Sequence, residues 1–156
     1  MRETMVSERL RKCVQNGLSI IVGTAGSEQV PACCRGLAVR TNDDFETVTV
    51  YVPVATSHEI MANIATTRRV AIVCSQIPTH ETTQIKGVTR AVRLAPPSDE
   101  AFVRERIEGF AEALDLIGLP RRVARSMNCW PAYAIDVSVE EVFDQTPGPK
   151  AGTPLT

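Results

Sequence analysis

The stretch that decides the fold is Thr47–Ser75, which reads TVTVYVPVATSHEIMANIATTRRVAIVCS. Valines alternate with polar or aromatic residues over 47–53, the two-residue period of a half-buried strand. Thr56 and Glu59 then match a T-x-x-E capping box, which predicts the start of a helix. The apolar run 69–74 predicts a second strand. Exposed backbone N–H groups at such a helix start can bind an anion such as a phosphate, although capped helices between strands also occur without any ligand.

Length and composition place the chain among ordinary globular proteins. It has 156 residues, of which 44% are hydrophobic and 22% charged, so we expect one domain with its own core. The formal net charge is −1 without a long run of one sign, which argues against nucleic-acid binding through phosphate neutralisation. No apolar run approaches ~18 residues, so no membrane partner is expected. Residues 1–17 lack the apolar core of a secretion signal, and we therefore expect a cytoplasmic location.

The rest of the chain adds more strands than helices. Alternating or continuous apolar runs predict further strands at 18–24, 30–40, 83–94 and 132–143, and helical spacing predicts helices at 5–16, 98–117 and 120–125. Short turns connect most of these strands, which favours an antiparallel sheet. The prediction is an α+β, mainly β fold: a six-stranded antiparallel barrel, closed or partly closed, with flanking helices. We expect one domain over 1–145, followed by an irregular tail rich in proline and glycine over 146–156.

The cysteines and histidines show no metal or catalytic pattern. Five cysteines are present, an odd number, and none forms a C-x-x-C pair, so we predict neither a metal site nor a disulfide framework. Cys33, Cys34 and Cys74 lie in strand-like apolar runs, where a free thiol acts as a small hydrophobe. The histidines have no H-E-x-x-H spacing, and the nucleophile elbow, the P-loop and the dinucleotide fingerprint are missing. The catalytic residues therefore stay unknown at this point.

Two pairs of polar residues stand out on the predicted strands. Arg35 and Arg40 are five positions apart on one strand, which puts them on opposite faces unless the strand bends between them. Gln84 and Lys86 share one face of a later strand, and Gly87 beside them is a candidate β-bulge. An amide such as Gln84 can form paired hydrogen bonds with the edge of a heterocycle. The alternative for both pairs is that they are ordinary surface residues without a ligand, because charged side chains are mostly exposed to solvent.

The order of these motifs resembles a known family. The chain carries Arg35-Gly-Leu-Ala-Val-Arg40, then Tyr51, then Thr56-Ser57-His58 at a helix start, then Thr83-Gln84-Ile85-Lys86-Gly87. Pyridoxamine 5′-phosphate oxidase-like FMN-binding split barrels have R-x-x-x-x-K/R on a strand, an S-R/K pair opening a helix and Q-x-x-G on a later strand. The similarity spans residues 18–94, and the ending FDQTPGPKAG looks like the tail of one subgroup of such proteins.

The resemblance implies a split barrel that forms a homodimer with FMN at the interface and acts on a small-molecule substrate. It implies flavin-dependent oxidoreductase chemistry, in which the cofactor performs the redox step and few protein acids or bases are needed. The residues carried over as cofactor-binding are Arg35, Arg40, Tyr51, Ser57, His58 and Gln84, and Lys86 is added from its position alone. Arg35 and Arg40 match the basic pair near the flavin phosphate and ring, and Gln84 matches a glutamine near the isoalloxazine.

The sequence departs from the family pattern after Ser57. Two basic residues are usual there, whereas this chain has His58 and Glu59. We expect Glu59 to turn back and cap Thr56, leaving Arg35 and Arg40 to carry the phosphate. The substrate-binding ending of true pyridoxamine phosphate oxidases is not evident, which argues against synthesis of pyridoxal phosphate.

Two further functional classes stay open. One is a flavin- or haem-binding split barrel that stores, senses or scavenges its cofactor without turnover. A haem protein would need an axial ligand, and His58 and His80 are the histidines that the sequence offers. The other is a reductase that uses the deazaflavin cofactor F420. The absorbance spectrum of the purified protein separates these classes.

Overall fold

A computed structural model describes residues 2–127 and 129–155. The strands are β1 (Leu18–Ala25), β2 (Pro31–Gly36), β3 (Ala38–Thr41), β4 (Thr47–Pro53), β5 (Arg69–Gln76), β6 (Thr82–Leu94), β7 (Ala132–Asp144) and β8 (Thr153–Pro154). The helices are α1 (Arg2–Cys13), α2 (His58–Thr67), α3 (Glu100–Leu116) and α4 (Arg122–Arg125), with single 3-10 turns η1 (Val54–Thr56) and η2 (Pro97–Asp99).

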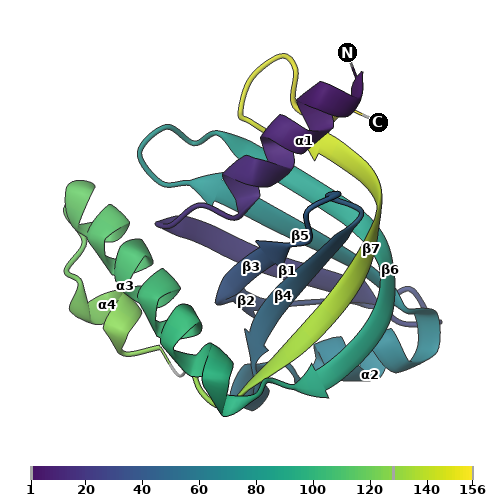
Figure 1. The fold of residues 1–156 in the computed structure, drawn as a ribbon, viewed down its shortest axis with the longest axis horizontal. Coiled ribbons are helices and arrows are strands. Elements are labelled where there is room, and N and C mark those ends of the chain that lie inside the picture. The colour runs from purple at the N-terminus through teal and green to yellow at the C-terminus, as the bar shows by residue number, and fades with distance from the viewer. Residues whose placement is uncertain (1, 128, 156) are drawn as a thin grey trace.

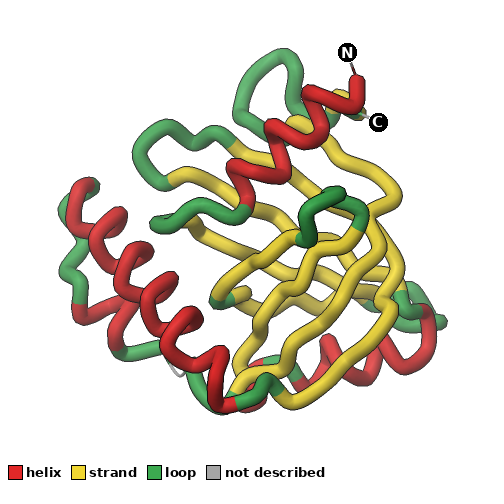
Figure 2. Tube along the Cα trace, viewed as in Figure 1, coloured by secondary structure: helices red, strands yellow, loops and turns green. Residues whose placement is uncertain are grey.

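All of these strands belong to one antiparallel sheet, in the order β2-β1-β5-β6-β7-β4-β3, with β8 paired to β7. The sheet curls into a split barrel with the helices on its outside (Figures 1 and 2). Aliphatic side chains fill the inside, among them Val22, Val50, Ile72, Ile85 and Ile135, each with no exposed surface. Each such side chain stabilises the fold by about 1.5–3 kcal/mol relative to an exposed one. The predicted antiparallel barrel with flanking helices is confirmed.

The number of strands differs from the prediction of six, because the described residues form eight. One reason is that the predicted strand 30–40 is interrupted at Leu37, whose N–H donates to the Tyr51 carbonyl oxygen at 2.8 Å. Cys34 before the interruption and Val39 after it both point into the barrel core, although five positions would place them on opposite faces of a regular strand. The interruption therefore reverses the alternation of inward and outward side chains.

The second additional strand lies in the tail, which we expected to be irregular. β8 pairs with the end of β7, and Leu155 next to it is 8% exposed and packs in the main core. The N–H of Leu155 donates to the carbonyl oxygen of Val142 at 2.8 Å. The prediction of an irregular tail was therefore wrong for these residues, because one buried leucine and a strand edge that still offers hydrogen bonds hold them in place.

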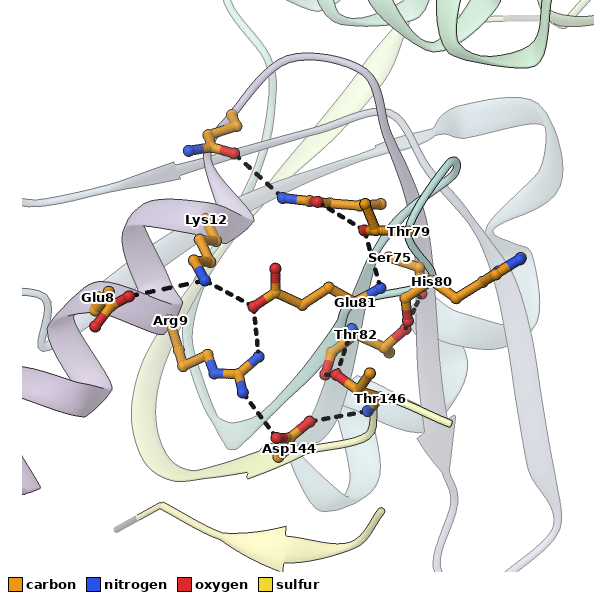
Figure 3. A network of polar contacts seen from close by, with 12 residues as sticks. Glu8, Arg9, Lys12, Ser75, Thr79, His80, Glu81, Thr82, Asp144 and Thr146 are labelled. Atoms are coloured by element: carbon orange, nitrogen blue, oxygen red, sulfur yellow. Dashed lines mark hydrogen bonds and ion pairs between the residues drawn. The ribbon is translucent and has the colours of Figure 1, made fainter. Parts of the chain in front are cut away.

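Helix α1 is attached to the sheet by a group of ion pairs (Figure 3). Arg9 reaches Glu81 at 2.9 Å and Asp144 at 2.7 Å, and Lys12 reaches Glu81 at 2.7 Å. Burial alone would raise the pKa of Asp144, but hydrogen bonds from Thr146 and the charge of Arg9 outweigh it and hold that pKa below its ordinary value. The charged contacts fix α1 across the ends of β6 and β7.

The start of α2 differs from the predicted capping box. Pro53 leads directly into the turn η1, which contains Thr56, so α2 begins two residues later at His58. Ser57 is the N-cap residue, and its hydroxyl donates to the Pro53 carbonyl oxygen at 2.6 Å instead of capping the helix. The predicted Thr56–Glu59 capping box was therefore wrong, and Glu59 is an exposed residue of the first helical turn.

Helix α3 lies on the outside of the barrel, where β2 ends and β3 begins (Figure 1). It covers a second apolar cluster on the outward side of β3, β4 and β7, which includes Leu37, Tyr51, Val103, Ile107 and Ala134. None of the helices in residues 2–127 and 129–155 has the length and apolar character needed to cross a membrane.

Candidate functional site

The outward face of the β2-β1-β5-β6 part of the sheet carries a row of directly paired residues. The row runs Arg35, Ile21, Val73, Gln84, Phe143 across five adjacent strands. The residues that alternate with them point into the core. Adjacent strands are ~4.8 Å apart, so the backbones of Arg35 and Gln84 are separated by about 14 Å. After the cofactor that the sequence resemblance implies, we call this row the flavin strip: an apolar stretch between a cation and an amide.

Arg35 is a half-buried cation without a counter-ion. Its Nη1 donates to the Ser19 hydroxyl at 3.1 Å, and its guanidinium carbon lies 4.9 Å from the centre of the Phe110 ring on α3. Burial lowers the pKa of Arg35, although an arginine remains charged at neutral pH. No carboxylate pairs with it within the described residues. A bound anion would supply a negative charge to balance the guanidinium of Arg35.

Gln84 and Lys86 share one face of β6, as predicted. The Gln84 carbonyl oxygen accepts from Gln145 Nε2 at 3.0 Å, which leaves the Gln84 NH₂ group without a partner in the described part of the chain. The Lys86 ammonium lies 4.5 Å from the centre of the Phe143 ring. The pairing of β6 with β7 is irregular at the predicted position, between Lys86 and Gly87, but the extra residue of the bulge lies on β7, because Lys86 pairs with Glu141 and Gly87 with Val139.

A hollow of about 660 Å³ lies beside the flavin strip. The residues that line it include Gly23 and Ala71, which are small, and the charged Lys86 and Glu141. Cys33 also lines it and is exposed, so the expectation that this thiol is a buried hydrophobe was wrong. The hollow extends the candidate site from the strip towards the loop between β1 and β2.

Arg40 and Tyr51 form a second group, outside the flavin strip. Arg40 Nη1 lies 3.1 Å from Asp99 Oδ1, and the Tyr51 hydroxyl donates to Asp99 Oδ2 at 2.8 Å. The Arg40 guanidinium carbon lies 3.9 Å from the centre of the Phe102 ring. Burial, followed by the hydrogen bond to Asp99, raises the pKa of Tyr51 to about 12. Asp99 therefore holds both residues in place.

Ser57 and His58 follow β4 at the start of α2. Ser57 is fully buried, with its hydroxyl bonded to the Pro53 carbonyl oxygen, whereas His58 is exposed. The structure thus divides the seven predicted site residues into two groups: Arg35, Gln84 and Lys86 on the flavin-strip face, and Arg40, Tyr51, Ser57 and His58 along β3, β4 and the start of α2.

Sequence reasoning missed the residues that α3 and the turn before it bring to both groups. Arg40 contacts Asp99 and Phe102, and Arg35 contacts Phe110. Arg106 contacts the same Phe102 ring. The spacing of four between Phe102, Arg106 and Phe110 places them on one side of a helix, and this signal was available in the sequence. Within residues 2–127 and 129–155, no group of three or more histidine, cysteine or carboxylate side chains could hold a metal ion.

Comparison with known sequences does not place the chain in a protein family. No model of a known protein family matches the chain, and no curated protein is significantly similar to it.

Solved structures are similar in fold. An FMN-binding protein from Syntrophomonas wolfei is 14% identical, with a TM-score of 0.55 over 90% of this chain and 88% of that one. A protein of the pyridoxinephosphate oxidase family from Clostridium acetobutylicum, related to general stress protein 26, is 12% identical, with a TM-score of 0.52 over 90% of this chain and 87% of that one.

An F420 reductase is also similar, at 12% identity and a TM-score of 0.51 over 85% of this chain and 94% of that one. These identities are too low to transfer an activity, and what they establish is the architecture. The chain has the split-barrel fold of the pyridoxamine 5′-phosphate oxidase-like and FMN-binding proteins.

Proposed function

We propose that this protein binds FMN and is a flavin-dependent oxidoreductase that acts on a small-molecule substrate. The observation that carries the proposal is the flavin strip, where two apolar residues lie between Arg35, which has no counter-ion in the described part of the chain, and Gln84, whose NH₂ group has no partner there. The similar fold of an FMN-binding protein supports the choice of ligand.

The described residues fit FMN in charge and shape. Arg35 would hold the phosphate, because charge-assisted hydrogen bonds from a guanidinium are strong and a phosphate would balance its charge. The apolar ring would cover Ile21 and Val73, which lie between Arg35 and Gln84. The free NH₂ group of Gln84 and the ammonium of Lys86 would donate to acceptor atoms on the polar edge of the ring. The flavin, once bound, would supply the redox chemistry.

The other four proposed residues lie outside the flavin strip. Arg40, Tyr51, Ser57 and His58 follow β3, β4 and the start of α2, whereas the flavin strip crosses β2, β1, β5 and β6. We propose that a homodimer brings the group along β4 of one subunit to the flavin strip of its partner, which completes a shared site.

Removing the Arg35 side chain tests the phosphate contact. Arg35→Ala should weaken FMN binding about ten-fold or more, because a hydrogen bond to a charged group contributes roughly 1.5–3 kcal/mol. Riboflavin, which lacks the phosphate, should bind the variant and the original protein with similar affinity. Arg90→Ala, which removes an exposed arginine from β6, serves as the matched control in fluorescence titrations. Equal losses of FMN and riboflavin affinity in Arg35→Ala would contradict the proposed phosphate site.

F420 is the second candidate ligand, because an F420 reductase is among the similar folds. Its deazaflavin ring is flat like that of FMN, so the flavin strip does not separate the two. Competition between FMN and F420 for the full chain, followed through quenching of FMN fluorescence, would show which one binds more tightly.

A further inference from the structure

The segment that follows β7 returns to the start of β6 and brings a second amide beside Gln84. The N–H of Gln145 donates to the carbonyl oxygen of Thr82 at 2.9 Å, and the N–H of Thr82 donates to the Thr146 hydroxyl at 3.0 Å. These two hydrogen bonds continue the contact between the two chain segments beyond Asp144, where the pairing of β6 with β7 ends. The backbone at Gln145 is therefore held in place.

The Gln145 side chain lies on the same face of the sheet as the flavin strip. Phe143, two residues earlier, is the strip residue that pairs with Gln84, and side chains two positions apart on extended backbone point to the same side. Gln145 is thus a diagonal neighbour of Gln84, within reach of a long side chain. Its Nε2 donates to the Gln84 carbonyl oxygen at 3.0 Å. Both amides are half-buried.

This hydrogen bond determines which half of the Gln84 amide is available to a ligand. A glutamine amide has a carbonyl oxygen that accepts and an NH₂ group that can donate two hydrogen bonds. Gln145 occupies the Gln84 oxygen, whereas the Gln84 NH₂ group has no partner within residues 2–127 and 129–155. Gln84 therefore presents donors to a ligand on the strip, and an amide turned by half a rotation would present an acceptor instead.

We propose that Gln145 is a positioning residue of the flavin site, which holds the Gln84 amide with its NH₂ group available to the ring. This role rests on the proposed flavin function. The polar edge of a flavin ring carries carbonyl oxygens and ring nitrogens, which are acceptors and match an NH₂ donor. An amide that is already oriented binds more tightly, because its rotation does not have to be frozen on binding. Gln145 acts through Gln84 and does not need to touch the ring.

Replacing Gln145 by its isosteric acid tests this role. A carboxylate only accepts, so in Gln145→Glu the Gln84 amide should turn over and donate its NH₂ group to the new carboxylate. FMN and riboflavin should then both bind about ten-fold more weakly, because the lost contact is to the ring and not to the phosphate. Gln76→Glu makes the same change at the end of β5, where the amide contacts Gln15, and should leave both affinities unchanged.

A double-mutant cycle shows whether Gln145 acts through Gln84. In the Gln84→Ala background, Gln145→Glu should change FMN affinity by at most about two-fold, because the amide that it orients is missing. A loss in that background as large as in the original protein would mean that the new charge acts on the ligand directly, and would overturn the positioning role. If Gln145→Glu does not fold, Gln145→Ala, which frees the Gln84 amide, should weaken binding of both ligands about three-fold or more, and unchanged binding would overturn the role.

The side-chain NH₂ resonances of Gln84 in nuclear magnetic resonance spectra give a readout that needs no flavin. They are assigned by their absence from the spectrum of Gln84→Ala, and in Gln145→Glu they should move downfield, because one N–H gains a carboxylate acceptor. A protein that binds flavin but shows no such shift would overturn the positioning role alone. A protein that shows the shift and takes up no flavin would overturn the flavin proposal, and the role of Gln145 towards the ring with it.

Discussion

Asp99 holds Arg40 and Tyr51 of the second residue group in place, although it was not among the predicted site residues. Its carboxylate accepts from Arg40 and from the Tyr51 hydroxyl at the same time. The Tyr51 ring is buried, so ionisation of its hydroxyl would place a negative charge in a desolvated position beside a carboxylate. Burial and the neighbouring carboxylate therefore both favour the protonated hydroxyl of Tyr51.

Replacing Asp99 should therefore change the titration of Tyr51. The pKa of Tyr51 is about 12, raised mainly by burial and next by the hydrogen bond to Asp99. In Asp99→Asn we expect a lower pKa, because the negative neighbour is removed while burial remains. Ultraviolet absorbance of the phenolate against pH measures it, and the Tyr133→Phe background assigns the signal to Tyr51. An unchanged pKa in Asp99→Asn would show that the carboxylate does not act on this hydroxyl.

At the scale of elements, the pairing of β6 with β7 is irregular beside the polar residues of the flavin strip, where Lys86 pairs with Glu141 and Gly87 with Val139, so that β7 carries one extra residue. A Cβ atom at Gly87 would lie 1.9 Å from the carbonyl oxygen of Ser138 and 2.9 Å from Val137 Cγ1. Only a glycine therefore lets β6 approach β7 at this point. Gln84 and Lys86 face outward because they alternate on β6 with the buried residues Ile85 and Gly87.

Gly87→Ala should destabilise the protein by about 1–3 kcal/mol, because the added methyl group must displace backbone atoms of β7. Urea unfolding followed by circular dichroism measures the loss. Gly23→Ala is the matched control on β1, since the nearest heavy atom to its new Cβ would be 3.9 Å away. A Gly87→Ala variant as stable as Gly23→Ala would mean that the two strands do not approach each other in this way.

The sequence predicted the elements wherever side chains alternate clearly. The strand 47–53 is predicted correctly because its inward residues are valines and its outward residues Thr47, Thr49 and Tyr51 are not aliphatic. The interruption at Leu37 was not found, because the residues around it are apolar on both faces and hide the change of alternation. That interruption turns Arg35 and Arg40 to the same outward side, where each stacks on a phenylalanine of α3.

Local signals failed where tertiary contacts decide the geometry. The Thr56–Glu59 pattern fits a capping box, but Pro53 starts a 3-10 turn that moves the helix start beyond Thr56. The exposure of Cys33 also depends on contacts, since its neighbours across the sheet are small. The flavin strip itself could not be predicted, because its members come from five strands whose order in the sheet is not written in any single segment.

At the scale of the whole molecule, the proposed site residues form two groups on one barrel, the flavin strip and the group along β3, β4 and the start of α2. Each subunit of a homodimer would then provide one group, which agrees with the outward apolar residues Ile21 and Val73 on the flavin strip. Light scattering should give twice the 17.0 kDa mass of one chain at micromolar concentration. Charged replacement of both residues, as Ile21→Lys with Val73→Lys, should give monomers, whereas a monomeric original protein would remove the shared site.

The most direct test of the flavin assignment is the absorbance spectrum of the purified full chain before and after incubation with FMN and gel filtration. We expect flavin bands that stay with the protein, and mass spectrometry of the material released on denaturation should identify FMN. A protein that retains no flavin after incubation, or one that carries haem absorbance instead, would contradict the proposal that this protein binds FMN.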